Sequence, residues 1–167
     1  RLILSNAEAF KVPPSLAFAL CWEESRFKTS AVNRANENST VDRGLFQLNG
    51  ASFPKLKEAD FFDPKQNVYY GISHLKWCLD TGGSEAAGLA MYNAGTVKVR
   101  DGGTPKRTLD YISSIINNRR RIEESFEDLY MQMKTPYEQL TLANEEAALR
   151  ENGKWSRLTL LGGQRGF

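Results

Sequence analysis

The pattern of apolar and polar positions along this 167-residue chain is typical of a mainly α-helical protein. Alternating apolar and polar runs joined by a hairpin turn, which would indicate paired strands, are scarce. Helix starts recur instead, several with proline at the first helical position, where the missing N–H has no intrahelical partner to lose. These signals predict helices over residues 1–10, 15–26, 64–79, 84–92 and 105–134.

The last of these helices carries its apolar residues at intervals of three and four, which is the spacing of one helix face. These residues are Ile112, Ile115, Ile116, Ile122, Phe126, Leu129, Tyr130 and Met133. Thr135, Pro136 and Glu138 then occupy the cap, first and third positions of a capping box, which predicts a separate helix to about residue 151. The tail from residue 152 onward is an extension beyond that helix.

Two segments interrupt the helical pattern. Residues 28–43 are rich in Asn, Ser and Thr and contain only Val32 and Val41 as large aliphatic residues, so we expect a loop or a small irregular hairpin there. Residues 93–103 are rich in glycine and are expected to connect two helices.

The composition is that of a soluble domain and excludes several protein classes. The length corresponds to about one domain, and the hydrophobic and charged fractions of 41% and 25% argue against disordered, fibrous and membrane-spanning chains. The net charge of +2 indicates no nucleic-acid partner, because the three arginines at 119–121 point in different directions on a helix and are expected on a solvated face. The chain begins at Arg1 without a signal peptide, so we expect a processed or trimmed form.

No cofactor and no metal ion are predicted. Cys21 and Cys78 form no C-x-x-C pair, so they are either buried free thiols or the two ends of one bridge between neighbouring helices. The single histidine, His74, is expected to be an ordinary surface or packing residue of its helix. The chain has no phosphate-binding loop, nucleophile elbow or calcium-binding loop.

Glu24 is the strongest candidate for acid–base chemistry. Leu16, Leu20 and Glu24 are spaced four residues apart in the second predicted helix, so they lie on one face. A carboxyl group at the end of an apolar face is partly desolvated, which raises its pKa and allows it to donate a proton near neutral pH. Glu23 is expected to face water. A glutamate at a helix end is also a common surface residue, so the spacing alone does not decide between the two interpretations.

Four sequence blocks extend this argument. They are Glu24-Ser25-Arg26-Phe27, Gly44-Leu45-Phe46-Gln47-Leu48-Asn49, Phe62-Asp63-Pro64 with Asn67 and Gly71, and Ala90-Met91-Tyr92-Asn93-Ala94-Gly95, followed by Tyr111. Their order and spacing resemble the soluble lytic transglycosylase domain of the lysozyme-like superfamily over residues 1–122. The resemblance implies a mainly α, lysozyme-like helical lobe, with residues 123–167 as a helical C-terminal extension and tail.

The resemblance also implies an activity and a set of site residues. Glu24 matches the family's single catalytic glutamate, which protonates the β-1,4 bond between N-acetylmuramic acid and N-acetylglucosamine and then, as a base, helps to form a 1,6-anhydro end. The implied substrate-binding residues are Ser25, Gln47, Asn49, Tyr92, Asn93 and Tyr111. Amides and phenols can hydrogen-bond hydroxyl and N-acetyl groups. On periodicity alone, Tyr92 and Tyr111 also fit the interpretation of core aromatics.

Asp42 departs from the pattern of many lytic transglycosylases, which have a neutral residue at that place. An aspartate two residues before Gly44 resembles the hen-type lysozyme pattern. A carboxylate about 5 to 5.5 Å from Glu24 would allow a retaining muramidase reaction on the same bond. Paired with Arg34 or Arg43, Asp42 would have no catalytic role. A further alternative is a glycan-binding module without turnover, for which the C-terminal extension would supply a partner surface.

The substrate implied by the resemblance determines the expected partner and location. The partner is the glycan strand of peptidoglycan, and the location is the periplasm or another extracytoplasmic part of a bacterial cell envelope. The apolar face of residues 123–167 could cover the catalytic lobe, shape one end of the cleft or bind a partner protein. We prefer packing on the lobe.

Overall fold

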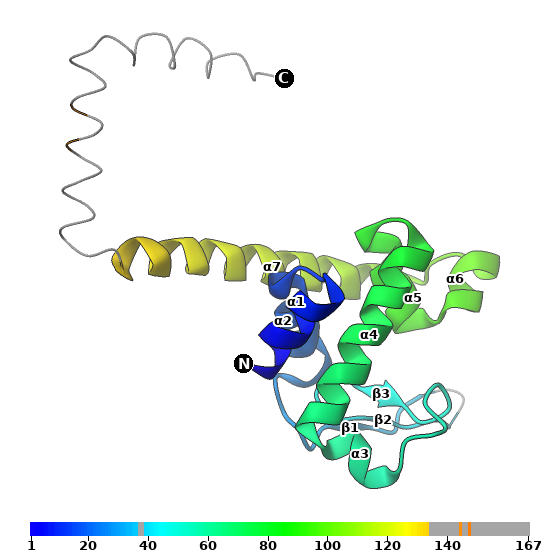
Figure 1. Ribbon diagram of the computed structural model, residues 1–167. Coiled ribbons are helices and arrows are strands. Elements are labelled where there is room, and N and C mark those ends of the chain that lie inside the picture. The colour runs from blue at the N-terminus through cyan, green and yellow to red at the C-terminus, as the bar shows by residue number, and fades with distance from the viewer. Residues whose placement is uncertain (37–38, 134–143, 145–146, 148–167) are drawn as a thin grey trace. The chain divides into compact units, whose positions relative to one another are not determined.

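The computed structural model describes residues 1–36, 39–133, 144 and 147 (Figure 1). Its helices are α1 (Leu2–Phe10), α2 (Pro14–Ser25), α3 (Glu58–Phe62), α4 (Pro64–Gly82), α5 (Glu85–Ala94), α6 (Thr96–Gly102) and α7 (Lys106–Met133), and its strands are β1 (Val32–Asn33), β2 (Asp42–Arg43) and β3 (Leu48–Asn49). The described part is therefore mainly α, as predicted. The helix predicted to reach residue 151 and the tail after it lie almost entirely outside the described residues.

The chain divides into two compact units, Arg1–Glu124 and Ser125–Phe167. The first unit contains the elements that carry the predicted site residues. The role predicted for the extension from residue 123 onward stays a prediction. Within the described residues, no helix is both long enough and apolar enough to cross a lipid bilayer.

Side-chain caps explain why two of the predicted helices begin where they do. Asp63 Oδ1 accepts a hydrogen bond from the backbone N–H of Gln66 at 2.9 Å, ahead of Pro64 at the first position of α4. Ser84 Oγ accepts a hydrogen bond from the N–H of Ala87 at 3.2 Å and caps α5 in the same way. Each bond satisfies an N–H that has no partner inside its own helix. The five predicted helices are confirmed to within a few residues at each end.

The two segments predicted as irregular contain short regular elements. The loop or hairpin expected over residues 28–43 contributes β1 and β2 to a three-stranded antiparallel sheet of order β1-β2-β3. Strands of two residues are too short to produce a detectable alternation. The connection expected over 93–103 contains α6, so that expectation was wrong. Its flanking glycines, Gly95 and Gly103, have positive φ values of 85° and 77° and separate α6 from its neighbours.

The core lies around α2, α4 and α5, and Asn67 joins it to the sheet. Asn67 of α4 is almost fully buried, and its amide makes three hydrogen bonds to the backbone. It accepts from the N–H of Phe46 at 2.8 Å and donates to the carbonyls of Phe61 at 2.7 Å and Arg43 at 3.0 Å. A buried amide with all of these partners satisfied fixes the segment around Phe46 against α4. Phe46 itself is fully buried beside Gly71.

Arg119 connects α7 to α5 and α2. Its guanidinium forms ion pairs with Glu85 of α5 and with Glu123 one turn further along α7, and Nε also donates to Ser15 Oγ at 3.3 Å. Ser15 in turn donates to Glu123 at 2.6 Å. The sequence predicted a solvated arginine face, whereas Arg119 belongs to a network that holds α7 in place. That placement brings Tyr111, two turns earlier, toward the end of α2.

The close approach of Phe46 and Gly71 gives a test of this packing. A Cβ at position 71 would lie 2.4 Å from both Cβ and Cγ of Phe46. Gly71→Ala should therefore lower the free energy of unfolding by about 1–3 kcal/mol, the usual cost of overpacking a core. Urea denaturation measures the change. Gly102→Ala is the matched control, because a Cβ there meets no atom within 4 Å and the residue does not have a positive φ. Equal losses in the two variants would contradict the account.

Candidate active site

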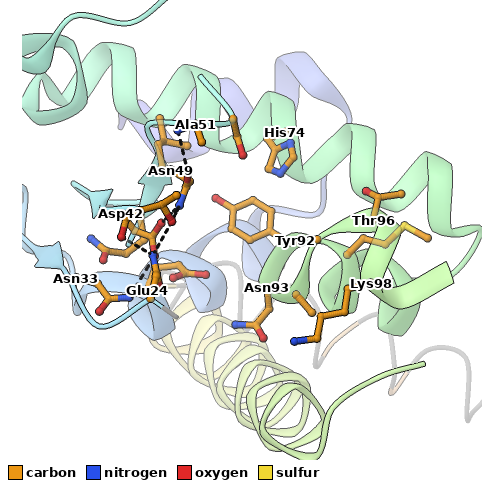
Figure 2. Close-up of a pocket in the computed structure, with 18 of the residues that line it drawn as sticks. Glu24, Asn33, Asp42, Asn49, Ala51, His74, Tyr92, Asn93, Thr96 and Lys98 are labelled. Carbon is orange, nitrogen blue, oxygen red and sulfur yellow. Dashed lines mark hydrogen bonds between the residues drawn. The ribbon is translucent and has the colours of Figure 1, made fainter. Parts of the chain in front are cut away.

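A cavity of about 1030 Å³ brings together almost all of the residues predicted from the sequence (Figure 2). Its walls come from the end of α2, the three-stranded sheet, α4, α5, α6 and the start of α7. The predicted residues that line it are Glu24, Asp42, Gln47, Asn49, Tyr92, Asn93 and Tyr111. Ser25 is the exception. The cavity is large enough for several sugar rings, since small-molecule sites are typically about 300–1000 Å³.

Glu24 stands in the last turn of α2, where its carboxyl group is partly buried. Burial raises the pKa of Glu24 from 4.5 to about 8, and the negative charges of Asp42 and Glu23 add to the rise. A hydrogen bond donated by Tyr111 Oη to Glu24 Oε1 acts in the opposite direction, because it stabilises the carboxylate. Glu24 therefore holds a proton at neutral pH. With Oε1 accepting from Tyr111, Oε2 is the oxygen that can carry that proton.

Two tyrosines and an asparagine form the wall around Glu24. Tyr92 of α5 donates its hydroxyl hydrogen to the carbonyl of Phe46 at 2.8 Å, which fixes its ring at the cavity surface. Burial raises the pKa of both Tyr92 and Tyr111 well above the usual value, so both hydroxyls remain neutral donors. Asn93 accepts a hydrogen bond from Thr108 Oγ1 at 2.8 Å through Oδ1, which orients its NH₂ group. Figure 2 shows Glu24, Tyr92 and Asn93 around the same space.

Asp42 is held by three asparagine amides. It lies on β2 in register with Asn33 of β1 and Asn49 of β3, so the three side chains are cross-strand neighbours. Asp42 Oδ2 accepts from Asn33 at 3.1 Å and from Asn36 at 2.8 Å, and Oδ1 accepts from Asn49 at 2.6 Å. These bonds fix both carboxylate oxygens (Figure 2). Asp42 therefore bonds to asparagines and not to Arg34 or Arg43, the pairing that would have left it without a catalytic role.

Ser25 and Gln47 contact the protein more than the cavity. Ser25 is buried and donates its hydroxyl hydrogen to the carbonyl of Leu45 at 2.8 Å, so the structure does not bring it to the cavity wall. It follows Cys21 by four residues and therefore shares the buried face of α2. The Gln47 amide nitrogen donates to the carbonyls of Ala31 at 3.2 Å and Gly44 at 2.9 Å. Its amide oxygen is the part that is available at the wall.

Several lining residues were missed from the sequence. His74 and Trp77 of α4 line the cavity together with Phe53, although His74 was expected to be an ordinary helix residue. Their three-residue spacing places them on one helix face, but no motif marks that face as a cavity wall. Lys98 of α6 lines the other side and belongs to a segment predicted as a connection, so nothing in the sequence indicated where its side chain points.

The two cysteines do not line the cavity. Both are buried and free, so the bridge left open by the sequence is not formed. Burial raises the pKa of each thiol to about 12, which leaves both protonated and unreactive at neutral pH. Among the described residues, no three His, Cys, Asp or Glu side chains come together as a metal site would need.

Sequence comparisons relate this chain to known proteins. Residues 1–114 match the sequence profile of the family described as the transglycosylase SLT domain. The protein IpgF of Shigella flexneri is 30% identical over 121 residues, which are 69% of this chain and 76% of that protein. The X polypeptide of Escherichia coli is 28% identical over 112 residues, which are 64% of either chain.

A solved structure has a similar fold. The crystal structure of an inactive mutant of the lytic transglycosylase Slt from Pseudomonas aeruginosa matches 75% of this chain with a TM-score of 0.62 and 17% sequence identity. This chain spans 24% of that protein. The match confirms the lysozyme-like helical fold that the sequence predicted.

Burial and the hydrogen bond from Tyr111 have opposite effects on the pKa of Glu24, and the two effects can be measured separately. In the intact protein, the carboxyl carbon of Glu24 should titrate near pH 8 in NMR spectra of ¹³C-labelled protein, with Glu24→Gln as the assignment control. Tyr111→Phe should move that pKa upward, because it removes the bond that stabilises the carboxylate. Tyr69→Phe is the matched control, since Tyr69 lies outside the cavity against Phe10 and Tyr70. A Glu24 pKa near 4.5 in the intact protein would refute the account.

Proposed function

Because the chain belongs to the transglycosylase SLT domain family and is a peptidoglycan lytic transglycosylase by that membership, we propose that Glu24 is its single catalytic acid and base. The bond cleaved is the β-1,4 bond between N-acetylmuramic acid and N-acetylglucosamine. The observation that supports the proposal most directly is the Glu24 carboxyl group at the wall of a glycan-sized cavity, hydrogen-bonded by Tyr111, with its pKa raised by burial.

The first step is protonation of the glycosidic oxygen by neutral Glu24. The C1–O bond of the muramic acid residue then breaks, the N-acetylglucosamine leaves with the proton, and C1 carries positive charge. The second step uses Glu24 as a carboxylate. It accepts the proton of the C6 hydroxyl of the same muramic acid residue while that oxygen bonds to C1, and the product has a 1,6-anhydro end. No water is consumed, and Glu24 is neutral again.

The environment of Glu24 favours both steps. Catalysis by proton transfer is most effective when the pKa of the group lies near the working pH, and about 8 satisfies that condition. After the first step, the carboxylate is disfavoured by burial and by the nearby charge of Asp42, so it has a strong tendency to take a proton back. The bond from Tyr111 limits that penalty and keeps the intermediate accessible.

The remaining cavity residues are suited to holding an amino sugar. Asn93 and the amide oxygen of Gln47 present amide groups that can bind hydroxyl and N-acetyl groups. The amide of Asn49 is occupied by hydrogen bonds within the protein. Tyr92 offers a flat ring of fixed orientation. Peptidoglycan lies outside the cytoplasmic membrane, so the proposed place of action is the periplasm or another part of the bacterial cell envelope.

Asp42 supports a second candidate reaction. Its carboxylate lies on the cavity wall and influences the pKa of Glu24, as a second catalytic carboxylate would. In a muramidase reaction, Asp42 would act as nucleophile or charge stabiliser at C1 and water would complete hydrolysis. The product would then have a reducing end rather than an anhydro end.

Substitution of Glu24 tests the proposed acid and base. Glu24→Gln is nearly isosteric and still accepts a hydrogen bond from Tyr111, but it cannot transfer a proton. We expect the release of soluble muropeptides from purified sacculi to fall at least about a hundredfold. Glu23→Gln is the matched control, because Glu23 bonds to Ser114 and Arg26 instead of lining the cavity, and it should retain most of the activity. Equal losses in both variants would remove Glu24 from its assigned role.

Substitution of Asp42 separates the two reactions. Products of the intact enzyme should be anhydro-muropeptides, which mass spectrometry identifies as one water molecule lighter than hydrolysed products. Asp42→Asn should keep the anhydro product, and it should lower the pKa of Glu24 because a negative charge is removed. Reducing ends in the intact enzyme that disappear in Asp42→Asn would instead establish the muramidase reaction.

A further inference from the structure

We propose that Trp77 is a stacking platform for an additional N-acetylhexosamine ring of the glycan strand, outside the pair of sugars that flank the cleaved bond. The inference rests on the proposed function and names a part of the cavity that the cleavage chemistry does not use. The platform consists of the Trp77 indole and the His74 imidazole behind it, both on α4.

The exposure and the position of Trp77 are the first observations. Trp77 lines the cavity and is 50% exposed, whereas the aliphatic residues Val68, Ile72 and Leu75 of the same helix are fully buried. His74 lies parallel to it, with the ring centroids 5.7 Å apart and an interplanar angle of 12°. Because His74 covers one face of the indole, a sugar ring would stack on the opposite face. An aromatic ring at the wall of a cavity that also carries polar groups offers a sugar ring a surface on which to stack.

The support behind Trp77 is rigid. The His74 ring meets Phe53 edge-on at 5.6 Å and 84°, and it lies 5.1 Å from the ring of Tyr92. Its Nε2 is 3.7 Å from the thiol sulfur of Cys78. These contacts hold the imidazole on several sides, so the indole stacked on it has a fixed orientation. A fixed ring loses little conformational entropy when a ligand binds.

The aromatic rings of Tyr92, His74 and Trp77 form a row that leads away from Glu24. Figure 2 shows Tyr92 between Glu24 and His74. His74 contacts both Tyr92 and Trp77, and therefore connects the ring next to the reaction centre to the exposed indole. A glycan strand that passes Tyr92 at the cleaved bond can thus reach Trp77 with a further sugar. This placement predicts an effect on strand binding rather than on the chemical step.

The chemistry of the ligand follows from the indole face. Aromatic rings carry negative charge on their faces, and the C–H groups on one face of a pyranose ring carry partial positive charge. The β-1,4-linked N-acetylhexosamines of a glycan strand present such faces, whereas their amides and hydroxyls point outward to polar groups. The ligand is therefore a sugar ring of the strand itself.

The test measures binding separately from cleavage. In Glu24→Gln protein, calorimetric titration with β-1,4-linked N-acetylglucosamine hexasaccharide and disaccharide compares a ligand that can reach Trp77 with one that is confined to the reaction centre. Trp77→Ala should weaken hexasaccharide binding about tenfold and leave disaccharide binding unchanged, and Trp77→Phe should restore most of the loss. In the active enzyme, Trp77→Ala should raise KM for glycan strands with little change in kcat.

Trp22→Ala is the matched control. Trp22 is 40% exposed, but it contacts Phe27 and Arg26 outside the cavity and should leave both affinities unchanged. Equal hexasaccharide affinity in Trp77→Ala and its parent, equal loss in the Trp22 variant, or no preference of the parent for the hexasaccharide would each overturn the platform. Failure of Glu24 as the acid would instead appear as cleavage that persists in Glu24→Gln, whatever the binding results.

Discussion

The partial burial of Glu24 is the constraint on which the site depends. A carboxyl group exposed at the end of α2 would be ionised at neutral pH and could not protonate a leaving oxygen. Burial raises its pKa to about 8, and the hydrogen bond from Tyr111 limits the rise. The result is a group that exchanges its proton in either direction near neutral pH. Burial without Tyr111 would favour the protonated form of Glu24 too strongly, because the carboxylate needed in the proposed second step would lack a stabilising partner.

The fold meets this requirement with contacts between segments far apart in the sequence. Glu24 and Tyr111 are 87 positions apart, so their bond depends on how α7 is placed against α2. The Arg119 network with Glu85 and Glu123 provides that placement outside the cavity. On the other side, the buried amide of Asn67 holds the Phe46 segment, whose carbonyl in turn orients Tyr92. Tyr111 and Tyr92 are thus each held in position by polar contacts that lie outside the cavity.

Sequence patterns predicted the five longer helices, because these depend on local spacing, and four motif blocks marked Glu24 as the candidate acid. They did not predict α3, α6 or the third strand of the sheet, since elements this short leave no periodic signal. Ser25 was assigned to the cleft from a motif, whereas its spacing from Cys21 places it on the buried face of α2. Trp77 was not predicted as a site residue, because no motif marks the helix face that it shares with His74. Only the tertiary structure shows that this face lines a cavity.

The surroundings of Asp42 are better suited to a fixed charge than to a nucleophile. Both of its oxygens accept amide hydrogens, and a hydrogen bond to a charged group contributes about 1.5–3 kcal/mol, so attack at a sugar carbon would require bonds to be given up. Held in place, the charge acts on the proposed reaction in two ways. It stabilises the positive charge that develops at C1, and it disfavours a second negative charge on Glu24, which drives that carboxylate to take the proton of the C6 hydroxyl. An aspartate that resembles a hydrolase residue can therefore promote the non-hydrolytic route.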